Sequence, residues 1–330
     1  MCTSFVLETL DGKHVLSRTM DFAFILEANP TVSPRNYEWK SSTDGVNYTN
    51  EYAFVGAGRE LDKYIFADGL NEKGLSCASL YLPGEAVYAP EAIDGKINLA
   101  PQEFLLWMLG TCATIEDVEA KLADINLVDQ PVALLGITTP LHWIFTDKSG
   151  RCAVIEPTET TLRIKENPVG VMTNTPRLEW HIENLRNYTG LQAQQLAPVK
   201  FGDYVAKPFS QGTGTSKLPG GFTPPERFVR AAYLKENVVP AKNEEEAITN
   251  VWYILNSVRI PNGAVIKDNG DPDFTQYVAS MCSESKTYYF TSYENNQINS
   301  VTLTDELLEN TKEPITYVVD TVQKVNHLAQ

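Results

Sequence analysis

The chain has few of the residues on which most metal and disulfide sites depend. Its 330 residues include four isolated histidines, His14, His142, His181 and His327. Its five cysteines are odd in number and scattered, and they form neither a CxxC pair nor a cluster with histidine. A disulfide framework and a zinc-dependent amidase are therefore disfavoured. A glycine-rich nucleotide-binding motif is also missing, so we expect no cofactor.

Positive charge is in short supply as well. Lys and Arg total 27 against 42 Asp and Glu, which gives a net charge of −15. Such a chain repels nucleic-acid phosphates and anionic membrane surfaces at long range, so we expect neither partner. No apolar run approaches the roughly 18 residues of a membrane span, and the start lacks the pattern of a signal peptide. These absences favour a cytoplasmic protein that acts on a small molecule.

The remaining composition is that of an ordinary globular protein, with 43% hydrophobic and 21% charged residues. The patterns predict helices at 101–108, from 114, and at 178–185, 226–235 and 244–255. They predict strands at 3–10, 14–20, 52–55, 63–67, 75–82, 141–146, 151–156, 161–164, 277–281, 287–291 and 298–303. Sequential hairpins without a βαβ rhythm favour an α+β fold, with two mainly antiparallel sheets packed together and covered by helices. We see no linker, so we expect one domain over 1–330.

The first two residues offer a minimal catalyst. Removal of Met1 would leave Cys2 with a thiol and a free α-amine on one carbon. A thiol is only a few per cent thiolate at neutral pH and needs a base, and an α-amine can serve as one. Chain termini usually fray, however, so the pair alone is weak evidence. A hairpin that turns at Asp11-Gly12 would bring Arg18 and Asp21 back beside this terminus.

Other candidate residues have structural explanations that must be weighed. Asn174 precedes Thr-Pro, where Asn is a common turn residue. A surface ion pair between Arg18 and Asp21 would be worth less than about 1 kcal/mol. Alternation at Phe22 and Phe24 is typical of the core face of a strand as well as of a pocket wall.

Six segments occur in an order that resembles the choloylglycine hydrolase family of N-terminal-nucleophile amidases. They are MCTSF at the start, SRTMDF (17–22), GLNEKGL (69–75), VMTNTP (171–176), LPGGFTPPERFVR (218–230) and MCSESKTYYF (281–290). The family includes penicillin V acylases and conjugated bile salt hydrolases. The resemblance implies a four-layer αββα fold and a homotetramer. We expect the assembly element at 183–209, with Tyr188, Leu191 and Leu196.

The resemblance also implies a mechanism at the N-terminus. After loss of Met1, the sulfur of Cys2 would attack an amide carbonyl and form a thioester acyl-enzyme, while its own amine carries the proton. Arg18 would lie beside the thiol, where its permanent positive charge favours the thiolate. Asp21 would accept a hydrogen bond from the amine and hold it in place.

The oxyanion of the tetrahedral intermediate needs donors, and the resemblance supplies candidates for them. The side-chain amide of Asn174 would be one donor, and the main-chain N–H of Tyr81 or of its neighbour the second. Arg227 matches the family arginine that braces the amine and Asp21. Arg230 is a weaker candidate for that role, and Arg177 is expected to face solvent.

Only a few positions in the sequence bear on the choice of substrate. Tyr81 stands where the family's bile salt hydrolases tend to have Asn and its penicillin V acylases Tyr. It therefore places the chain nearer the penicillin V acylase branch, with removal of a phenoxyacetyl group as the expected reaction. We expect the acyl group to contact Tyr81, Leu82, Phe22 and Phe24. The chain departs from the family motif at Gly221, where an acidic residue is usual, and at Glu226, where serine is frequent.

Alternatives remain open at this point. A conjugated bile salt hydrolase or an N-acyl homoserine lactone acylase would use the same chemistry on another acyl or amine group. A catalytically silent small-molecule-binding protein would keep the pocket and retain Met1. A thiol redox enzyme is a weaker rival, because no other cysteine lies near Cys2 in the sequence.

Overall fold

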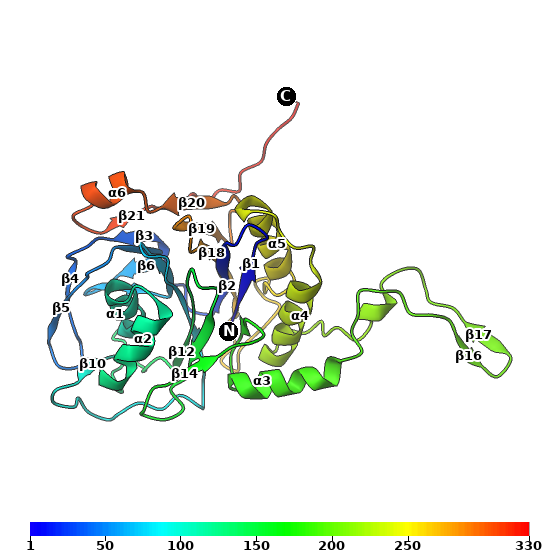
Figure 1. The fold of residues 1–330 in the computed structure, drawn as a ribbon, viewed down its shortest axis with the longest axis horizontal. Helices are drawn as coiled ribbons and strands as arrows, with labels where there is room; N and C mark the ends of the chain where they lie inside the picture. The colour runs from blue at the N-terminus through cyan, green and yellow to red at the C-terminus, as the bar shows by residue number, and fades with distance from the viewer. Residues whose placement is uncertain (330) are drawn as a thin grey trace.

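Two β-sheets lie face to face, and helices cover the outer face of each (Figure 1). The structure is a computed structural model, and it describes residues 1–329. The first sheet has the order β15 (Val171–Met172), β1 (Cys2–Glu8), β2 (His14–Phe22), β18 (Phe274–Cys282), β19 (Thr287–Ser292) and β20 (Asn299–Thr302). All of its neighbouring strands are antiparallel. This sheet carries the N-terminus in its interior.

The second sheet packs against the first through contacts of β8, β9 and β12 with β1, β2 and β18. Its order is β14 (Ile164–Glu166), β13 (Cys152–Ile155), β12 (Leu141–Thr146), β9 (Ser76–Tyr81), β8 (Asp68–Asn71), β6 (Phe54–Glu60), β3 (Asn29–Ser33) and β21 (Ile315–Thr316), with β7 (Tyr64–Phe66) also paired to β6. Three two-stranded ribbons complete the strands: β4 (Glu38–Lys40) with β5 (Asn47–Thr49), β10 (Ile97–Leu99) with β11 (Ile125–Leu127), and β16 (Val199–Phe201) with β17 (Tyr204–Ala206). These layers confirm the predicted α+β fold.

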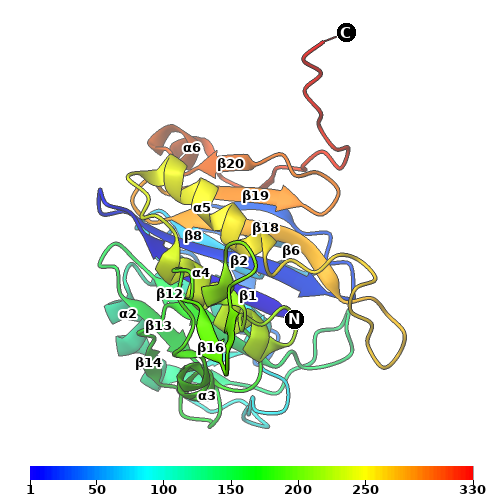
Figure 2. The same cartoon turned by 90° about the vertical axis from the view of Figure 1, so that its right-hand side faces the viewer.

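Helices seal the two outer faces. The α-helices are α1 (Phe104–Thr111), α2 (Ile115–Lys121), α3 (Leu178–Asn184), α4 (Pro224–Asn237), α5 (Glu244–Asn256) and α6 (Asp305–Asn310). Short 3-10 helices cover Pro101–Glu103, Leu122–Asp124, Leu185–Tyr188 and Thr213–Thr215. Figure 2 shows α4 and α5 in front of β1, β2 and β18, which they contact, while α1 packs on β8 and β9. One apolar core lies between the sheets and under α4 and α5, and a second lies beneath α1 and α2.

The opening hairpin forms as the sequence predicts. Gly12 takes a φ of 80°, a conformation that glycine adopts at little cost, and the turn aligns β1 with β2 over their whole length. Cys2 is thus paired with Met20, and Ser4 with Arg18. The register brings Arg18 and Asp21 to the N-terminal end of the chain.

Helix signals are also confirmed, with small shifts at the ends. The helix expected at 101–108 starts as the 3-10 turn Pro101–Glu103 and continues as α1. Thr114 caps α2, because its hydroxyl accepts a hydrogen bond from the N–H of Asp117 at 3.2 Å. None of the helices within residues 1–329 is long and apolar enough to cross a membrane.

One local prediction was wrong. The strand expected at 161–164 lies later, at β14, because the turn after β13 is longer than its polar residues suggested. The segment 183–209, where we expect the assembly element, contains several short elements. It leaves α3 through a 3-10 turn and enters the ribbon of β16 and β17, which extends away from the layers (Figure 1).

Candidate active site

Cys2 begins β1 and is almost fully buried, with 2% of its surface exposed. Arg18, on the neighbouring strand, donates a hydrogen bond from Nη2 to the sulfur of Cys2 at 3.0 Å. The guanidinium is also within 3.4 Å of the thioether sulfur of Met20. A cation in direct contact with a cysteine sulfur favours the thiolate over the thiol.

The charge of Arg18 is held in place from the second sheet. Asp68, on β8, is as completely buried as Arg18 and accepts a hydrogen bond from Arg18 Nη1 at 3.3 Å. The hydroxyls of Tyr277 and Tyr288 donate to the same carboxylate at 2.6 Å each. Burial lowers the pKa of Arg18. The negative charges that Tyr277, Cys2 and Asp68 can carry raise it by more in total, so the net shift of the pKa is upward. The arginine therefore stays charged beside the sulfur.

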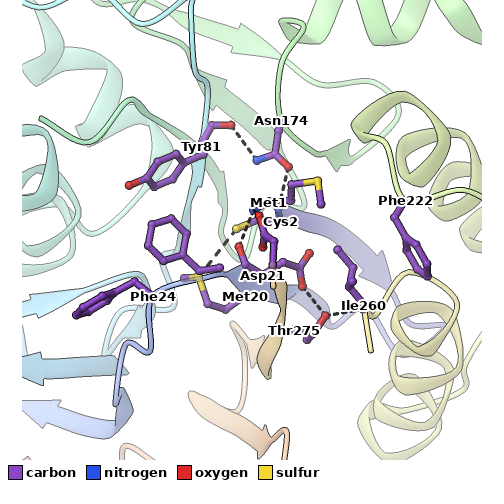
Figure 3. A network of polar contacts seen from close by, with 12 residues as sticks. Met1, Cys2, Met20, Asp21, Phe24, Tyr81, Asn174, Phe222, Ile260 and Thr275 are labelled. Atoms are coloured by element: carbon purple, nitrogen blue, oxygen red, sulfur yellow. Dashed lines mark hydrogen bonds and ion pairs between the residues drawn. The ribbon is translucent and has the colours of Figure 1, made fainter. Parts of the chain in front are cut away.

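Asn174 lies in the turn after β15 and joins three parts of the site (Figure 3). Its Oδ1 accepts hydrogen bonds from the N–H of Cys2 and from Arg227 Nη2, both at 2.8 Å. Its Nδ2 donates to the carbonyl of Tyr81 at 2.8 Å. The side-chain amide is thus fixed between β1, β9 and α4.

Arg227 comes from the first turns of α4 and is fully buried. Besides Asn174, it donates to the carbonyl of Cys2 and to the hydroxyl of Thr3, the latter at 2.6 Å. The groups of the N-terminal site that it holds directly are Cys2, Thr3 and Asn174, and its bracing of the amine and Asp21 stays a prediction. Asp21 is near enough that its charge raises the pKa of Arg227, while burial, the larger effect, lowers it.

The carboxylate of Asp21 is buried beneath the N-terminus. It accepts hydrogen bonds from the hydroxyls of Thr275 at 2.5 Å and Thr19 at 3.0 Å. Complete burial raises the pKa of Asp21, and Arg227 and the terminal amine lower it less strongly. With Met1 in place, main-chain hydrogen bonds run from Met1 N to Asp21 O at 2.6 Å and from Asp21 N to Met1 O at 3.0 Å. Met1 therefore continues the ladder of the hairpin past Cys2.

An apolar pocket opens at the sulfur of Cys2. It is lined by Cys2, Met20, Phe22, Phe24, Leu26, Ala28, Ala57, Arg59, Leu61, Ile65, Phe66, Ala67, Ser79, Tyr81, Gln102, Val132, Leu134, Leu135, Thr139 and Leu141. The rings of Phe22 and Tyr81 contact each other with centroids 5.1 Å apart. Three of the four residues predicted to bind the acyl group, Phe22, Phe24 and Tyr81, are in this wall.

The fourth, Leu82, was predicted wrongly. It is fully buried and is absent from the pocket lining within residues 1–329. Successive side chains of an extended segment point to opposite sides, so a residue directly after Tyr81 faces away from the pocket. Leu82 N–H donates to Pro140 O at 2.7 Å, which fixes this orientation.

The two departures from the family motif lie against each other. A Cβ atom on Gly221 would stand 2.2 Å from a carboxylate oxygen of Glu226, so the Glu226 side chain fills the space beside that glycine. Glu226 also accepts a hydrogen bond from the hydroxyl of Thr223 at 2.6 Å. Arg230 donates to the carbonyls of Pro219 and Gly221 and so holds the loop. The distances are 2.7 and 2.9 Å.

Sequence reasoning missed the residues that support the turn at Asn174. His142 Nε2 lies 3.0 Å from the carbonyl of Thr173, and His181 Nε2 donates to the carbonyl of Asn174 at 2.8 Å. The other ring nitrogen of His142 contacts the buried carboxylate of Glu156 at 3.1 Å. The histidines are isolated in the sequence, and only the pairing of β12 with β13 brings His142 and Glu156 together. Arg177, as expected, is exposed.

Comparison with known proteins places the chain in a family. Residues 2–317 match the model of the linear amide C-N hydrolases, choloylglycine hydrolase family. The chain belongs to this family. It is 38% identical to a bile salt hydrolase/transferase of Clostridium perfringens over 99% of this chain and 100% of that protein. The C2A mutant structure of conjugated bile acid hydrolase from the same organism covers both chains completely, with 37% identity and a TM-score of 0.92.

These findings confirm an amidohydrolase of the choloylglycine hydrolase family with the N-terminal-nucleophile fold, acting on a small-molecule amide. They support the bile salt hydrolase alternative better than the expected penicillin V acylase branch. A penicillin V acylase of Pectobacterium atrosepticum is 24% identical over 88% of this chain and 78% of that protein, and so is more distant than the bile salt hydrolases. The expectation rested on the single position Tyr81, whereas the sequence identity is counted over nearly the whole chain.

Proposed function

We propose that this protein hydrolyses the amide bond of conjugated bile salts, with Cys2 as the nucleophile after removal of Met1. The observation that carries the proposal is the position of the Cys2 sulfur. It lies at the wall of an apolar pocket and in contact with Arg18. An apolar acyl group bound in that pocket would present its carbonyl carbon to the sulfur. The similarity to bile salt hydrolases supports this substrate class.

In the proposed mechanism the Cys2 amine acts as the base. Its nitrogen already faces Asn174 Oδ1 at 2.8 Å, and loss of Met1 would make it a free amine. The amine accepts the thiol proton as the sulfur attacks the carbonyl, and it then protonates the leaving amine. Asp21 holds the protonated amine, while Arg227 fixes the backbone of Cys2. Water cleaves the thioester and releases the acid.

Two groups are proposed to stabilise the oxyanion. Asn174 Nδ2 carries two hydrogens, and the carbonyl of Tyr81 accepts only one of them. The second donor is the main-chain N–H of Tyr81. Leu82 N–H points toward β12, where it donates to Pro140 O, and amides alternate along a strand, so Tyr81 N–H points away from β12.

Penicillin V is the second candidate substrate, and one observation favours it. The ring of Tyr81 packs on Phe22 inside the pocket and provides an aromatic face for a phenoxyacetyl group. A small aromatic acyl group would contact this pair, whereas a larger acyl group would extend further toward Leu134 and Leu135.

The test combines intact mass with release of the amine product. We expect Met1 to be absent from the active protein, and glycine or taurine to be released from conjugated bile salts faster than penicillin V is cleaved. Cys2→Ala should abolish both reactions, while Cys152→Ala, which changes another cysteine outside the pocket lining, should retain them. Faster cleavage of penicillin V would reverse the order of the two substrates. Hydrolysis by a verified Cys2→Ala preparation would refute the nucleophile.

We also propose that the chain is one domain and assembles as a homotetramer through the ribbon of β16 and β17. The ribbon and its flanks expose large apolar side chains, including Phe201, Tyr204 and Phe209, at 66%, 70% and 96%. Burial of such side chains against another copy would favour assembly. Light scattering of the intact protein and of Phe201→Ser tests this, with a reduced mass expected for the variant. An unchanged mass would show that the ribbon is not the assembly interface.

A further inference from the structure

Asn174 stands just past the end of a strand, beyond the part of the main chain that the sheet holds. The ladder between β1 and β15 ends at Met172, which is paired with Ser4. Thr173 and Asn174 lie beyond this ladder and are still buried, with 1% and 3% of their surface exposed. Buried carbonyl oxygens need hydrogen-bond donors, so those of Thr173 and Asn174 must find theirs outside the ladder.

Two histidines on separate elements face these two carbonyls. His142, on β12, places Nε2 3.0 Å from the carbonyl oxygen of Thr173. His181, on α3, donates from Nε2 to the carbonyl of Asn174 at 2.8 Å. The first carbonyl belongs to the peptide unit before the Cα of Asn174, and the second belongs to the unit after it. Because peptide units are planar, holding both fixes the backbone dihedral angles of Asn174 and the direction of its Cα–Cβ bond.

The ring of His142 is held from its other side by a buried carboxylate. Its Nδ1 lies 3.1 Å from Glu156, which also accepts hydrogen bonds from Lys165 Nζ at 2.9 Å and from the N–H of Leu178 at 3.0 Å. Burial raises the pKa of Glu156, but His142 and Lys165 lower it by more, so the carboxylate is ionised and only accepts. Both groups that face the ring are therefore acceptors, and each ring nitrogen of His142 is placed to donate.

The ring of His181 is fixed in a different way. It stacks on Phe228 of α4, with ring centroids 4.7 Å apart and an interplanar angle of 12°. Its Nδ1 is buried and has no hydrogen-bond partner within residues 1–329. Burial lowers the pKa of His181 and is the largest effect on it, so the ring is neutral. Its single hydrogen lies on Nε2, where it is donated to Asn174.

The direction of the Asn174 side chain matters because it joins the nucleophile to the proposed oxyanion donor (Figure 3). Its Oδ1 accepts from the N–H of Cys2, and its Nδ2 donates to the carbonyl of Tyr81, both at 2.8 Å. We propose that His142 and His181 are positioning residues for the oxyanion donor, because they hold the two peptide units that flank Asn174 and so aim its side-chain amide. This role rests on the function proposed above for Asn174.

Paired substitutions separate each hydrogen bond from the bulk of its ring. Glutamine places an amide nitrogen near the position of Nε2, whereas asparagine reaches only the position of Nδ1. We expect His142→Asn and His181→Asn to lower kcat for glycocholate roughly 10-fold or more, because the donor is misplaced. KM should stay within about 2-fold of wild type, since substrate binding does not use the donor. His142→Gln and His181→Gln should retain most of kcat.

A second readout does not require turnover. The sulfur of Cys2 can add to cholan-24-al, so that a C–S bond forms, the carbonyl π bond breaks and the thiol proton passes to the aldehyde oxygen. That oxygen then occupies the position of the oxyanion. Cholan-24-ol has the same skeleton without a carbonyl group, so the ratio of the two dissociation constants, measured by calorimetry, reports the support given to this oxygen. The advantage of the aldehyde should fall about 10-fold in both asparagine variants, as it should in Asn174→Ala, and persist in both glutamine variants.

His14→Asn and His14→Gln are the matched controls. His14 is also buried and faces a carboxylate, with Nδ1 2.9 Å from Glu284, but it lies at the opposite end of β2 from the partner of Cys2. Both controls should keep the wild-type kcat and the wild-type ratio. Thermal unfolding verifies that each variant is folded. If neither asparagine variant folds, the near-isosteric Glu156→Gln loosens the hold on His142 and should lower the ratio, and an unchanged ratio would count against the proposal.

Equal kcat values in the asparagine and glutamine variants would overturn the proposal, as would folded asparagine variants that keep the wild-type ratio. The histidines would then only stabilise the turn. A lower kcat in Asn174→Ala without any effect of the histidine variants would keep the proposed function and refute the positioning role. Absence of hydrolysis by the wild-type protein would refute the proposed function, while the ratio of aldehyde to alcohol binding would still decide the role of the histidines.

Discussion

Replacement of Asp68 by asparagine should strongly destabilise the protein. The carboxylate receives hydrogen bonds from Arg18, Tyr277 and Tyr288, and also from the N–H of Ala57 at 3.3 Å. At 3.3 Å and an effective dielectric constant of about 20, the attraction between Asp68 and Arg18 is about 5 kcal/mol, most of which offsets desolvation. Asp68→Asn removes that attraction and leaves the fully buried guanidinium without its carboxylate partner. The expected loss of unfolding free energy is about 3–5 kcal/mol.

Urea denaturation followed by tryptophan fluorescence measures this loss as a lower midpoint. Asp62→Asn is the matched control, because the Asp62 side chain is 76% exposed, and its change should stay within about 0.5 kcal/mol. Tyr277→Phe removes one hydroxyl from the same carboxylate and should cost about 1 kcal/mol. An Asp68→Asn midpoint equal to that of the control would show that the charge of Arg18 is compensated elsewhere, and would refute the reasoning.

Three further predictions concern the site and its support. Asn174→Ala should lower kcat for amide hydrolysis roughly 100-fold or more, with one oxyanion donor lost, and normal specific activity in a less stable protein would make Asn174 structural. The pKa of Glu156 is raised by burial but lowered more by His142 and Lys165, to below its ordinary 4.5. Its ionised form therefore stabilises the fold above that pH, and the stabilisation disappears as pH falls through the lowered pKa. The melting-temperature difference between wild type and Glu156→Gln should accordingly be large at pH 7 and shrink below about pH 4, and a pH-independent difference would count against the ion pair. Leu82→Ala should destabilise by about 2–5 kcal/mol in urea titrations because this side chain is core, and a change confined to KM would return it to the pocket.

The parts of the site that were predictable depend on local rules. A two-residue turn at Asp11-Gly12 fixes the register of β1 and β2, and that register alone brings Arg18 and Asp21 to Cys2. Cap residues such as Thr114 and the apolar run of α1 likewise mark helices within a few positions. The order of the motif segments was sufficient to predict the family.

The remaining parts depend on contacts between the layers. Asp68 follows Arg18 by fifty residues and lies on the other sheet, and no periodic pattern relates the two positions. Short strands such as β3, β4 and β21 take their form from the neighbours with which they pair, and so were missed. The Leu82 error had a local cause, because the alternation of an extended segment was not applied to the residue after Tyr81.

Gly221 and Glu226 show that two departures from a motif can be one structural exchange. The carboxylate of Glu226 occupies the space that a side chain at 221 would need, and it bonds within the loop through Thr223. In engineering, residues 221 and 226 should therefore be exchanged together. Grafting an acidic residue onto position 221 alone would bring two carboxylates together and require the half-exposed Glu226 side chain to move, and grafting serine onto position 226 alone would remove the carboxylate to which Thr223 donates. Chimeras between this protein and its relatives should therefore have their junctions outside 218–230, so that the whole loop comes from one parent.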